Sequence, residues 1–557
     1  MSTRVLVAAV AIVACLVTSA GAPGGRGAAA GEVTKLAVGL APGASAATVA
    51  REVERRTGHR PESLAPIRAL VVEAPAHVSF AGIPGIRYVE PVRTRRLALT
   101  PTDPFVPKQW YLTASNFYTS WITFPAFEPI PVAIIDSGVD AGHPELAGRI
   151  LDAKSFVGGS ARVDTLGHGT FVAGLIAAGV DNGIGIAGLA PSAQLLIAKV
   201  VTPSRTIPVD AEARAIRWAV DNGARVINMS LGGLRDPLDP SLDTYSRLEE
   251  DAISYAVQNG VVVVAAVGNS DLAPSSPWPY ASYPAALPHV LGVSAYGPDG
   301  SVPTFSNRDR IYNDIAAPGE EILSIFPRPL TARYPACADQ GYSSCGPEMY
   351  RDAQGTSFAT PQVSAAAAVL LSLRPRLRPD QVTTILERSA DDLAPATGCS
   401  ACAPGRDALS GWGKLDVAAA ISALSGLLPT PDRYEPNDDA GSHAFRLYAS
   451  NPQITANVDF WDDQDDVYAI SLKRKQRVYV GLTAVSKQPG DLGLALWLPA
   501  TRSIEDVRNS RLRVRTSARP GGRQYFSYRA PKAGTYFVQV RMSTPGSATY
   551  RLTIVKG

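Results

Sequence analysis

The chain contains the stretch Gly355-Thr356-Ser357-Phe358-Ala359-Thr360-Pro361, a run of small residues that leads into an apolar segment over residues 363–373. We expect a turn followed by a helix, because the apolar segment has helical length. A serine in the first turn of a helix lies beside unpaired backbone N–H groups and at the positive end of the helix dipole. Such a position stabilises an oxyanion, although the same stretch is also typical of an ordinary helix N-cap. Ser357 is therefore a candidate nucleophile only if the rest of the chain supplies a base and an acid.

Apolar strand-like runs alternate with helix-like segments from Trp110 to about Leu428. The runs are apolar on both faces, as strands inside a parallel sheet must be. This alternation predicts an α/β domain over residues 104–428 with a doubly wound, mostly parallel sheet, in which ligands bind at the carboxyl ends of the strands. The expected strands are residues 131–136, 195–201, 225–229, 261–267 and 290–293, and the expected helices are residues 168–178, 209–222, 248–259, 356–373 and 379–390.

Two smaller units are predicted on either side of this domain. Residues 31–100 read as strands around one helix, which indicates a compact α+β unit that ends in a basic and then turn-rich connector. After a linker rich in Pro, Asp and Asn at 429–439, helical patterns disappear. Residues 432–557 alternate at period two between turns, which predicts an antiparallel β-sandwich.

The N-terminus has the features of a secretory signal peptide. Arg4 precedes an apolar run over residues 5–17, and small residues at 19–22 suit a cleavage site. That run is too short to cross a bilayer, and no later run approaches the required length of about 18 residues. We therefore expect residues 1–22 to be removed and the mature protein to be secreted, without a membrane anchor. Residues 12–15 also resemble a lipoprotein signal box, but the apolar run continues past the cysteine.

Four cysteines remain once the signal peptide and Cys15 are removed: Cys337, Cys345, Cys399 and Cys402. An even number in an exported protein indicates two disulfides, for which three pairings are possible. Proximity in sequence favours Cys337 with Cys345 and Cys399 with Cys402. The Cys-x-x-Cys pair would also suit a redox site or half of a metal site, but no second such pair accompanies it.

Composition and charge exclude several classes of protein. The chain has 557 residues, of which 46% are hydrophobic and 18% charged, as in globular proteins. Its formal net charge is +3, and the excess of Lys and Arg lies before residue 101. The bulk of the chain is therefore not a polycation, and we expect no nucleic-acid partner. We expect a monomer in the mature form.

An acid and a base precede the candidate nucleophile at equivalent places in the predicted fold. Asp136 stands where the apolar strand over residues 131–136 ends, and His168 opens a helix between two glycines. Each alone has a simpler interpretation, as a turn former and as a helix cap or core residue. Together with Ser357 they fall at strand ends or helix starts along one edge of one sheet. A serine nucleophile requires such a combination, a base that takes its proton and an acid that holds the imidazolium.

These residues lie in sequence blocks that resemble the subtilisin-like serine peptidases, or subtilases, over about residues 131–412. The blocks are Ile135-Asp136-Ser137-Gly138-Val139-Asp140, Gly167-His168-Gly169-Thr170-Phe171-Val172-Ala173-Gly174 and the opening stretch. The order Asp, His, Ser is also that of subtilisin. The resemblance implies a serine endopeptidase that cleaves polypeptides through an acyl-enzyme. It also implies that Asn269 completes the oxyanion hole together with the Ser357 backbone N–H.

The resemblance further implies where a polypeptide substrate is held. Residues 228–233 match the edge strand on which the family lays the substrate main chain, a form of β-augmentation. Ser282 falls on a loop that lines the primary specificity pocket in the family. The expected substrate-binding residues are Ser230, Leu231, Gly232, Ala266 and Gly268.

The flanking units also have counterparts in the family. Residues 31–100 resemble the inhibitory propeptide, which helps folding and whose tail covers the active site until it is cleaved. This implies an autoprocessed zymogen with maturation between about Arg96 and Asp103. Residues 432–557 resemble, more weakly, the small β-sandwich found C-terminal to many secreted bacterial peptidases, the pre-peptidase C-terminal type.

A structural calcium ion is a further implication of the resemblance, although the chemistry needs no cofactor. Residues 180–186 match the family's calcium loop, in which oxygen ligands suit Ca²⁺. The expected ligands are Glu145, Asn182, Val180, Ile184 and Ile186. Glu145 replaces the usual aspartate, and the loop is one residue longer than in the family.

One function of another class fits the same fold, a catalytically inactive subtilase-like protein that binds polypeptides. An α/β-hydrolase esterase is disfavoured because Ser357 has no glycine two residues later. The chain has no His-Glu-x-x-His motif for a zinc peptidase. Residues 327–353, which hold Cys337 and Cys345, form an unusually long connection before the nucleophile, and we expect a cystine-stapled flap near the substrate cleft.

Overall fold

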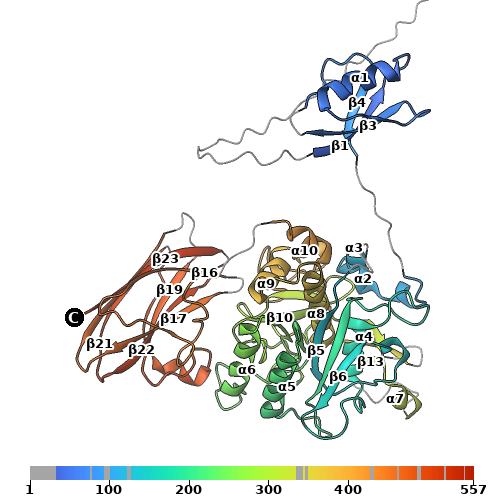
Figure 1. Ribbon diagram of the computed structural model, residues 1–557. Helices are drawn as coiled ribbons and strands as arrows, with labels where there is room; N and C mark the ends of the chain where they lie inside the picture. Colours follow the sequence, from blue (N-terminus) through green and yellow to red (C-terminus); the bar gives the residue numbers. More distant parts are fainter. Residues whose placement is uncertain are drawn as a thin grey trace, which may run out of the picture. The chain divides into compact units, whose positions relative to one another are not determined.

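The computed structural model divides the chain into two compact units, Met1–Leu97 and Ala98–Gly557 (Figure 1). It describes residues 33–75, 78–92, 101–121, 127–333, 343–344, 349–426, 432–460, 463–485, 491–519, 522–544 and 546–557. The expected signal peptide, Cys337, Cys345 and most of the expected maturation region lie outside the described residues.

The first unit is an antiparallel sheet with one helix. Its strand order is β2-β3-β1-β4, and α1 packs its apolar face on the sheet through Val49 and Val53. Ser45 caps α1 by accepting from the Thr48 N–H, and Gly58 ends it in the left-handed conformation. The elements are β1 (Val33–Leu40), α1 (Ala46–Thr57), β2 (Glu62–Ser63), β3 (Ala69–Pro75) and β4 (Ile86–Pro91).

The second unit is built on a seven-stranded sheet with the order β11-β10-β9-β8-β5-β7-β6. Every pair of neighbouring strands in it is parallel. Its central strands are buried on both faces, which explains their continuous apolar sequences. The strands are β5 (Ile130–Asp136), β6 (Ile150–Ser155), β7 (Ala193–Lys199), β8 (Val226–Met229), β9 (Val262–Ala266), β10 (Val290–Tyr296) and β11 (Ile315–Pro318).

Helices cover both faces of this sheet, so it is doubly wound as predicted (Figure 1). The helices α4 and α8 share one apolar core with α9 and α10, and α5 packs with α6 on the other face. A small second sheet, β12-β14-β13, lies beside α4. The bounds are α2 (Trp110–Ala114), α3 (Tyr118–Trp121), α4 (His168–Ala177), α5 (Val209–Asp221), α6 (Arg247–Gln258), β12 (Ile322–Ile325), α7 (Arg328–Arg333), β13 (Ser343–Ser344), β14 (Tyr350–Ala353), α8 (Thr356–Leu373), α9 (Pro379–Arg388) and α10 (Val417–Ala423).

The helix α8 is the core helix of this domain. Among the described residues it is the helix whose length and apolar composition would suit a membrane span, but 89% of it is buried inside the protein. It packs against β8, β9, β10 and β11 and against α4. Its first turn therefore has a fixed position relative to the strand ends.

The C-terminal part of the second unit is a sandwich of two sheets, as predicted. One sheet has the order β15-β17-β22-β19-β20 and the other β16-β23-β18-β21, with alternate residues of both directed into a common apolar core. The strands are β15 (Phe445–Arg446), β16 (Gln453–Asp459), β17 (Asp465–Leu472), β18 (Arg477–Ala484), β19 (Leu492–Trp497), β20 (Arg513–Ser517), β21 (Arg523–Arg529), β22 (Gly534–Met542) and β23 (Ser547–Lys556).

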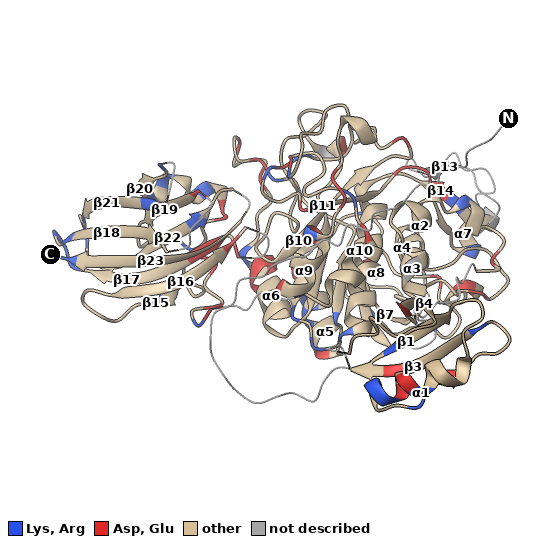
Figure 2. Ribbon diagram, turned by 90° about the horizontal axis from the view of Figure 1, so that it is seen from above, with Lys and Arg blue, Asp and Glu red and all other residues tan. Residues whose placement is uncertain are grey.

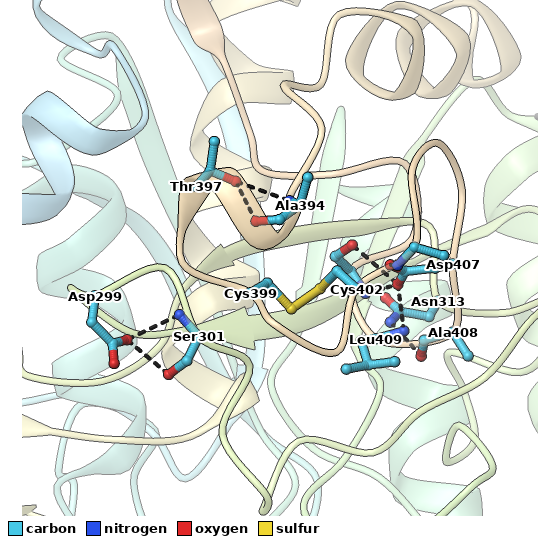
Figure 3. Close-up of a disulfide and its surroundings, with 12 residues drawn as sticks. Asp299, Ser301, Asn313, Ala394, Thr397, Cys399, Cys402, Asp407, Ala408 and Leu409 are labelled. Atoms are coloured by element: carbon cyan, nitrogen blue, oxygen red, sulfur yellow. Dashed lines mark hydrogen bonds between the residues drawn. A yellow bond between two sulfur atoms is a disulfide. The ribbon is translucent and has the colours of Figure 1, made fainter.

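One disulfide joins Cys399 to Cys402, with the two Cα atoms 5.3 Å apart (Figure 3). Both cysteines are buried and pack with Tyr296 and Leu393. The neighbouring loop is held by Asp407, whose carboxylate accepts from the backbone N–H groups of residues 403, 409 and 410. Because both cysteines are buried in this cluster, we interpret the pair as a structural bridge.

Candidate active site

Asp136 and His168 lie side by side at the carboxyl edge of the parallel sheet. Asp136 is the last residue of β5, which lies between β7 and β8 where the strand order reverses. Nδ1 of His168 lies 2.9 Å from each carboxylate oxygen of Asp136. The Asp136 side chain is 3% exposed, and the His168 side chain is 22% exposed. The carboxylate is therefore shielded, and the imidazole remains partly accessible.

Glycines and aromatic rings hold the imidazole in place. A β-carbon on Gly169 would lie 2.2 Å from the carbonyl oxygen of Gly138, so only glycine lets α4 approach the loop after β5 so closely. The ring centroid of Phe358 lies 5.3 Å from that of His168. The ring of the buried Phe171 packs in turn on Phe358, with the two centroids 4.5 Å apart. Phe171 and Phe358 thus form the apolar support of the base.

A second buried carboxylate, Asp164, organises the segment between β6 and α4. One of its oxygens accepts from the Ser137 hydroxyl at 2.9 Å and from the N–H groups of Leu166 and Gly167. The other oxygen accepts from the N–H and the hydroxyl of Thr170. Asp164 therefore ties the start of α4, where His168 lies, to the residue that follows Asp136. Sequence analysis did not identify it, because Asp164 lies three residues before the N-cap Gly167, outside the position that a capping pattern covers.

The nucleophile candidate lies in the first turn of α8, where Pro361 alters the hydrogen bonding. Proline has no N–H, so the carbonyl of Ser357, four residues earlier, lacks its helical partner. The Ser230 hydroxyl, at the end of β8, donates to that carbonyl at 2.7 Å. In return the Ser357 hydroxyl lies 3.2 Å from the Ser230 carbonyl. Ser230 thus fixes the turn that carries Ser357.

This connection continues into the core through Asn228. Its Nδ2 donates to the Ser230 hydroxyl at 3.0 Å, and its Oδ1 accepts from the Ser364 hydroxyl at 2.8 Å. Asn228 and Ser364 are fully buried. A continuous network therefore joins the middle of α8 to the strand end beside Ser357.

Asn269, just beyond β9, is oriented by the same helix start. Its Oδ1 accepts from the Thr356 N–H at 3.1 Å and from the Thr356 hydroxyl at 3.0 Å. Both partners donate to the oxygen, so the amide nitrogen is directed elsewhere and lies 3.3 Å from the place of a β-carbon on Gly355. The Nδ2 donor therefore lies beside the turn that bears Ser357.

The expected substrate-binding residues lie on either side of this turn. Ser230, Leu231 and Gly232 follow β8, and the next residue forms a backbone bridge with Tyr283. Ala266 ends β9. Gly268 has a left-handed φ of +96°, and a β-carbon there would meet the Ser282 hydroxyl at 2.2 Å. The structure thus brings the predicted residues together around Ser357, with Ser282 beside them.

The expected calcium loop is organised differently. The Glu145 carboxylate accepts from Asn182 Nδ2 at 3.0 Å, from the Ile186 N–H at 2.8 Å and from the Tyr350 hydroxyl at 3.1 Å. The Asn182 oxygen accepts from the Ile184 N–H. These oxygens already accept from protein donors, so the two side chains offer a cation few free lone pairs in this arrangement. The carbonyls expected from Val180, Ile184 and Ile186 alone make a poor Ca²⁺ site, and no step of the chemistry uses one.

The charges around His168 favour its protonated form. Burial lowers the pKa of the imidazole, but the adjacent Asp136 carboxylate and the nearby Asp164 outweigh burial, so the pKa lies above its ordinary value of 6.5. An imidazole that can take up a proton, at the sheet edge where the turn of Ser357 and two potential oxyanion donors also lie, suits acyl transfer.

A model of the Subtilase family matches residues 129–413, slightly more than half of the chain. The chain belongs to the subtilase family. It is a serine-type endopeptidase, and its fold is that of a subtilase.

Individual subtilases align over different shares of their length. Subtilisin DY from Bacillus licheniformis is 36% identical over 47% of this chain and 84% of its own length. Fervidolysin from Fervidobacterium pennivorans is 31% identical over 65% of this chain and 53% of its own. A solved structure titled as proteases from Pseudoalteromonas arctica aligns with 58% of this chain and 99% of its own, at 28% identity and a TM-score of 0.47.

In this subtilase we expect Asp164→Asn to reduce kcat/KM by about 10- to 100-fold, because the amide would direct N–H groups at existing donors and would no longer hold α4. The acid limb of the pH profile should also move. His168 must be neutral to act as a base, so activity falls as pH drops through its raised pKa. Loss of the Asp164 charge lowers that pKa and moves the limb to lower pH. The measurement is kcat/KM between pH 5 and pH 9.

The matched control for this prediction is Asp210→Asn, on the exposed first turn of α5. It should leave both the rate and the acid limb unchanged. A rate loss in Asp164→Asn without any displacement of the limb would mean that Asp164 acts on folding alone.

Proposed function

We propose that this protein is an exported endopeptidase that hydrolyses polypeptides with Asp136, His168 and Ser357 as its catalytic triad. The observation that carries the proposal is the contact of His168 Nδ1 with both oxygens of a buried Asp136, at the strand edge where Ser357 opens α8. The main-chain groups that follow β8 and β9 flank Ser357, and they favour a polypeptide as the substrate.

The proposed reaction follows from these positions. His168 Nε2 takes the Ser357 proton as the Oγ–C bond forms, and Asp136 keeps Nδ1 protonated and stabilises the imidazolium. The Asn269 Nδ2 and the N–H of Ser357 hold the oxyanion. His168 then gives the proton to the leaving amine as the C–N bond breaks. Water, activated in turn by His168, hydrolyses the acyl-enzyme and restores Ser357.

We further propose that the first unit is an inhibitory propeptide and that the chain is made as a zymogen. Its small antiparallel sheet with a capped helix has its own apolar core, so it can fold as a unit before cleavage. It is followed by the connector at residues 93–104, in which we expect the maturation cleavage. Export, through the expected signal peptide, belongs to the same proposal.

We expect Ser357→Ala to keep residues 23–100 when produced in a host that lacks extracellular proteases, because the nucleophile that cuts the connector is absent. The unaltered chain should lose them, as shown by mass and N-terminal sequencing of both proteins. The control is Ser372→Ala, at the far end of the same helix, which should mature normally. Normal maturation of Ser357→Ala would contradict self-processing, and failure of the mature chain to cleave casein would contradict the endopeptidase proposal.

A further inference from the structure

The outer face of the sheet β16-β23-β18-β21 carries arginine and tyrosine side chains in ordered rows. Residues paired across neighbouring strands form a row. In one row, Thr483 lies between Arg551 and Arg523. Three rows away on the same face, Arg477 lies directly opposite Arg529. We call these four arginines, with the two tyrosines described next, the arginine–tyrosine face.

The rows between the arginines are aromatic and open. Tyr525 lies opposite Gly481, and Tyr479 opposite Ser527, on adjacent strands. Tyr525 is 61% exposed and Tyr479 is 47% exposed. Gly481 leaves free space, because a β-carbon there would meet no atom within 4 Å. No side chain therefore rises from the strand position beside Tyr525 in the middle of the face.

Charge on this face is of one sign. The exposed positions of β16, β18, β21 and β23 include arginines but no carboxylate, because Asp459, the acidic residue of these strands, is buried. The cationic ends of these strands are visible in Figure 2. In the described part of the chain none of the four arginines forms an ion pair with a carboxylate.

The register of Arg477 and Arg529 is costly for the sheet itself. Like charges directly opposite each other on neighbouring strands are destabilising. Exposed aromatic side chains on a flat sheet add a risk of association. A face that combines both is not explained by stability, but it suits an anionic partner, since Arg binds carboxylates in a bidentate manner and Tyr and Arg are enriched at binding surfaces.

We propose that the arginine–tyrosine face binds an extended acidic segment of a polypeptide. Arg523 and Arg529 are six residues apart on one strand, which corresponds to roughly 20 Å. An extended chain covers that distance with about six residues. Carboxylates near its two ends would meet the arginine rows, and its middle residues would pack on Tyr479 and Tyr525. Neutral glycans fit less well, because arginine offers donors but no acceptor for sugar hydroxyls.

Binding to this face is testable without catalysis in the full chain carrying Ser357→Ala, so its failure is distinct from failure of the proposed function. The probe is poly-L-glutamate at neutral pH and 50 mM NaCl. Poly-L-lysine, which carries the opposite charge, is the comparison polymer. We expect Arg477→Ala/Arg529→Ala and, separately, Tyr479→Ala/Tyr525→Ala to weaken binding of poly-L-glutamate by about 10-fold each. Raising NaCl to 200 mM should also weaken it by several-fold.

The matched control is Lys473→Ala/Arg511→Ala, which removes two exposed cations of the same domain outside the face and should change the affinity by less than about 2-fold. Arg477→Lys/Arg529→Lys keeps the charge and should retain most of the binding, which guards against misfolding of the alanine variants. Unchanged affinity in both alanine pairs, or salt-independent binding, would overturn the proposal. Tighter binding to vesicles of anionic lipid than to poly-L-glutamate would overturn it in favour of a membrane.

Discussion

Replacing His168 by alanine is expected to lower kcat by about 10⁶-fold, because the variant loses the base that activates Ser357 and the acid that protonates the leaving amine. KM should change little, since His168 lies beside the main-chain groups that hold substrate rather than among them. The measurement is hydrolysis of a peptide anilide by the mature variant, whose first unit is removed by a trace of the active enzyme and then cleared.

Asp136→Asn provides the comparison for this variant. It keeps the shape of the contact with Nδ1 but no longer stabilises the imidazolium or fixes the productive tautomer, and we expect a loss of about 10⁴-fold in kcat. The double variant should be no worse than His168→Ala, because the two residues act as one unit. Additive losses, or a His168→Ala variant within about 10-fold of the parent, would contradict the assigned roles.

Asn269→Asp is expected to lower kcat by about 10²- to 10³-fold with little change in KM, because an oxyanion donor is replaced by a carboxylate. This substitution keeps the oxygen that accepts from Thr356, so the first turn of α8 retains its support. The measurement is kcat and KM on the same anilide, together with thermal unfolding.

Asn269→Ala separates the two functions of this side chain. It removes both the donor and the acceptor for Thr356, so it should lose as much kcat as Asn269→Asp and should also unfold at a lower temperature. A fall confined to KM in both variants would assign Asn269 to substrate binding instead of the oxyanion.

The fold of the α/β domain was predictable because its elements carry strong local signals. The expected helices and strands occur within about three residues of their predicted bounds, and α8 begins and ends where predicted. The strands β6 and β11 were not predicted. β6 is half exposed at the sheet edge, so its sequence is not continuously apolar, and β11 has only four residues, the last of which is a proline. Such short or mixed segments acquire their conformation from pairing with a neighbour.

The placement of Asp136, His168 and Ser357 at strand ends and helix starts was predictable, but the network of hydrogen bonds around them was not. Asp136, His168 and Ser357 follow from strand ends, helix starts and glycine spacing. The function of Ser230 as the partner of the Ser357 carbonyl depends on Pro361 and on contact across 127 positions of sequence, which no local pattern encodes. The packing of the expected calcium loop could not be predicted for a similar reason, because the Tyr350 hydroxyl that reaches Glu145 comes from a distant strand.

The central claim is that Ser357 is the nucleophile and that His168 activates it. The most direct measurement is reaction of the mature protein with a fluorophosphonate, followed by mass spectrometry of the peptide that carries the label. We predict one adduct, on Ser357, which forms rapidly in the parent and at a rate at least about 10³-fold lower in His168→Ala. An adduct on another serine, or equal labelling of Ser357 in both proteins, would contradict the account.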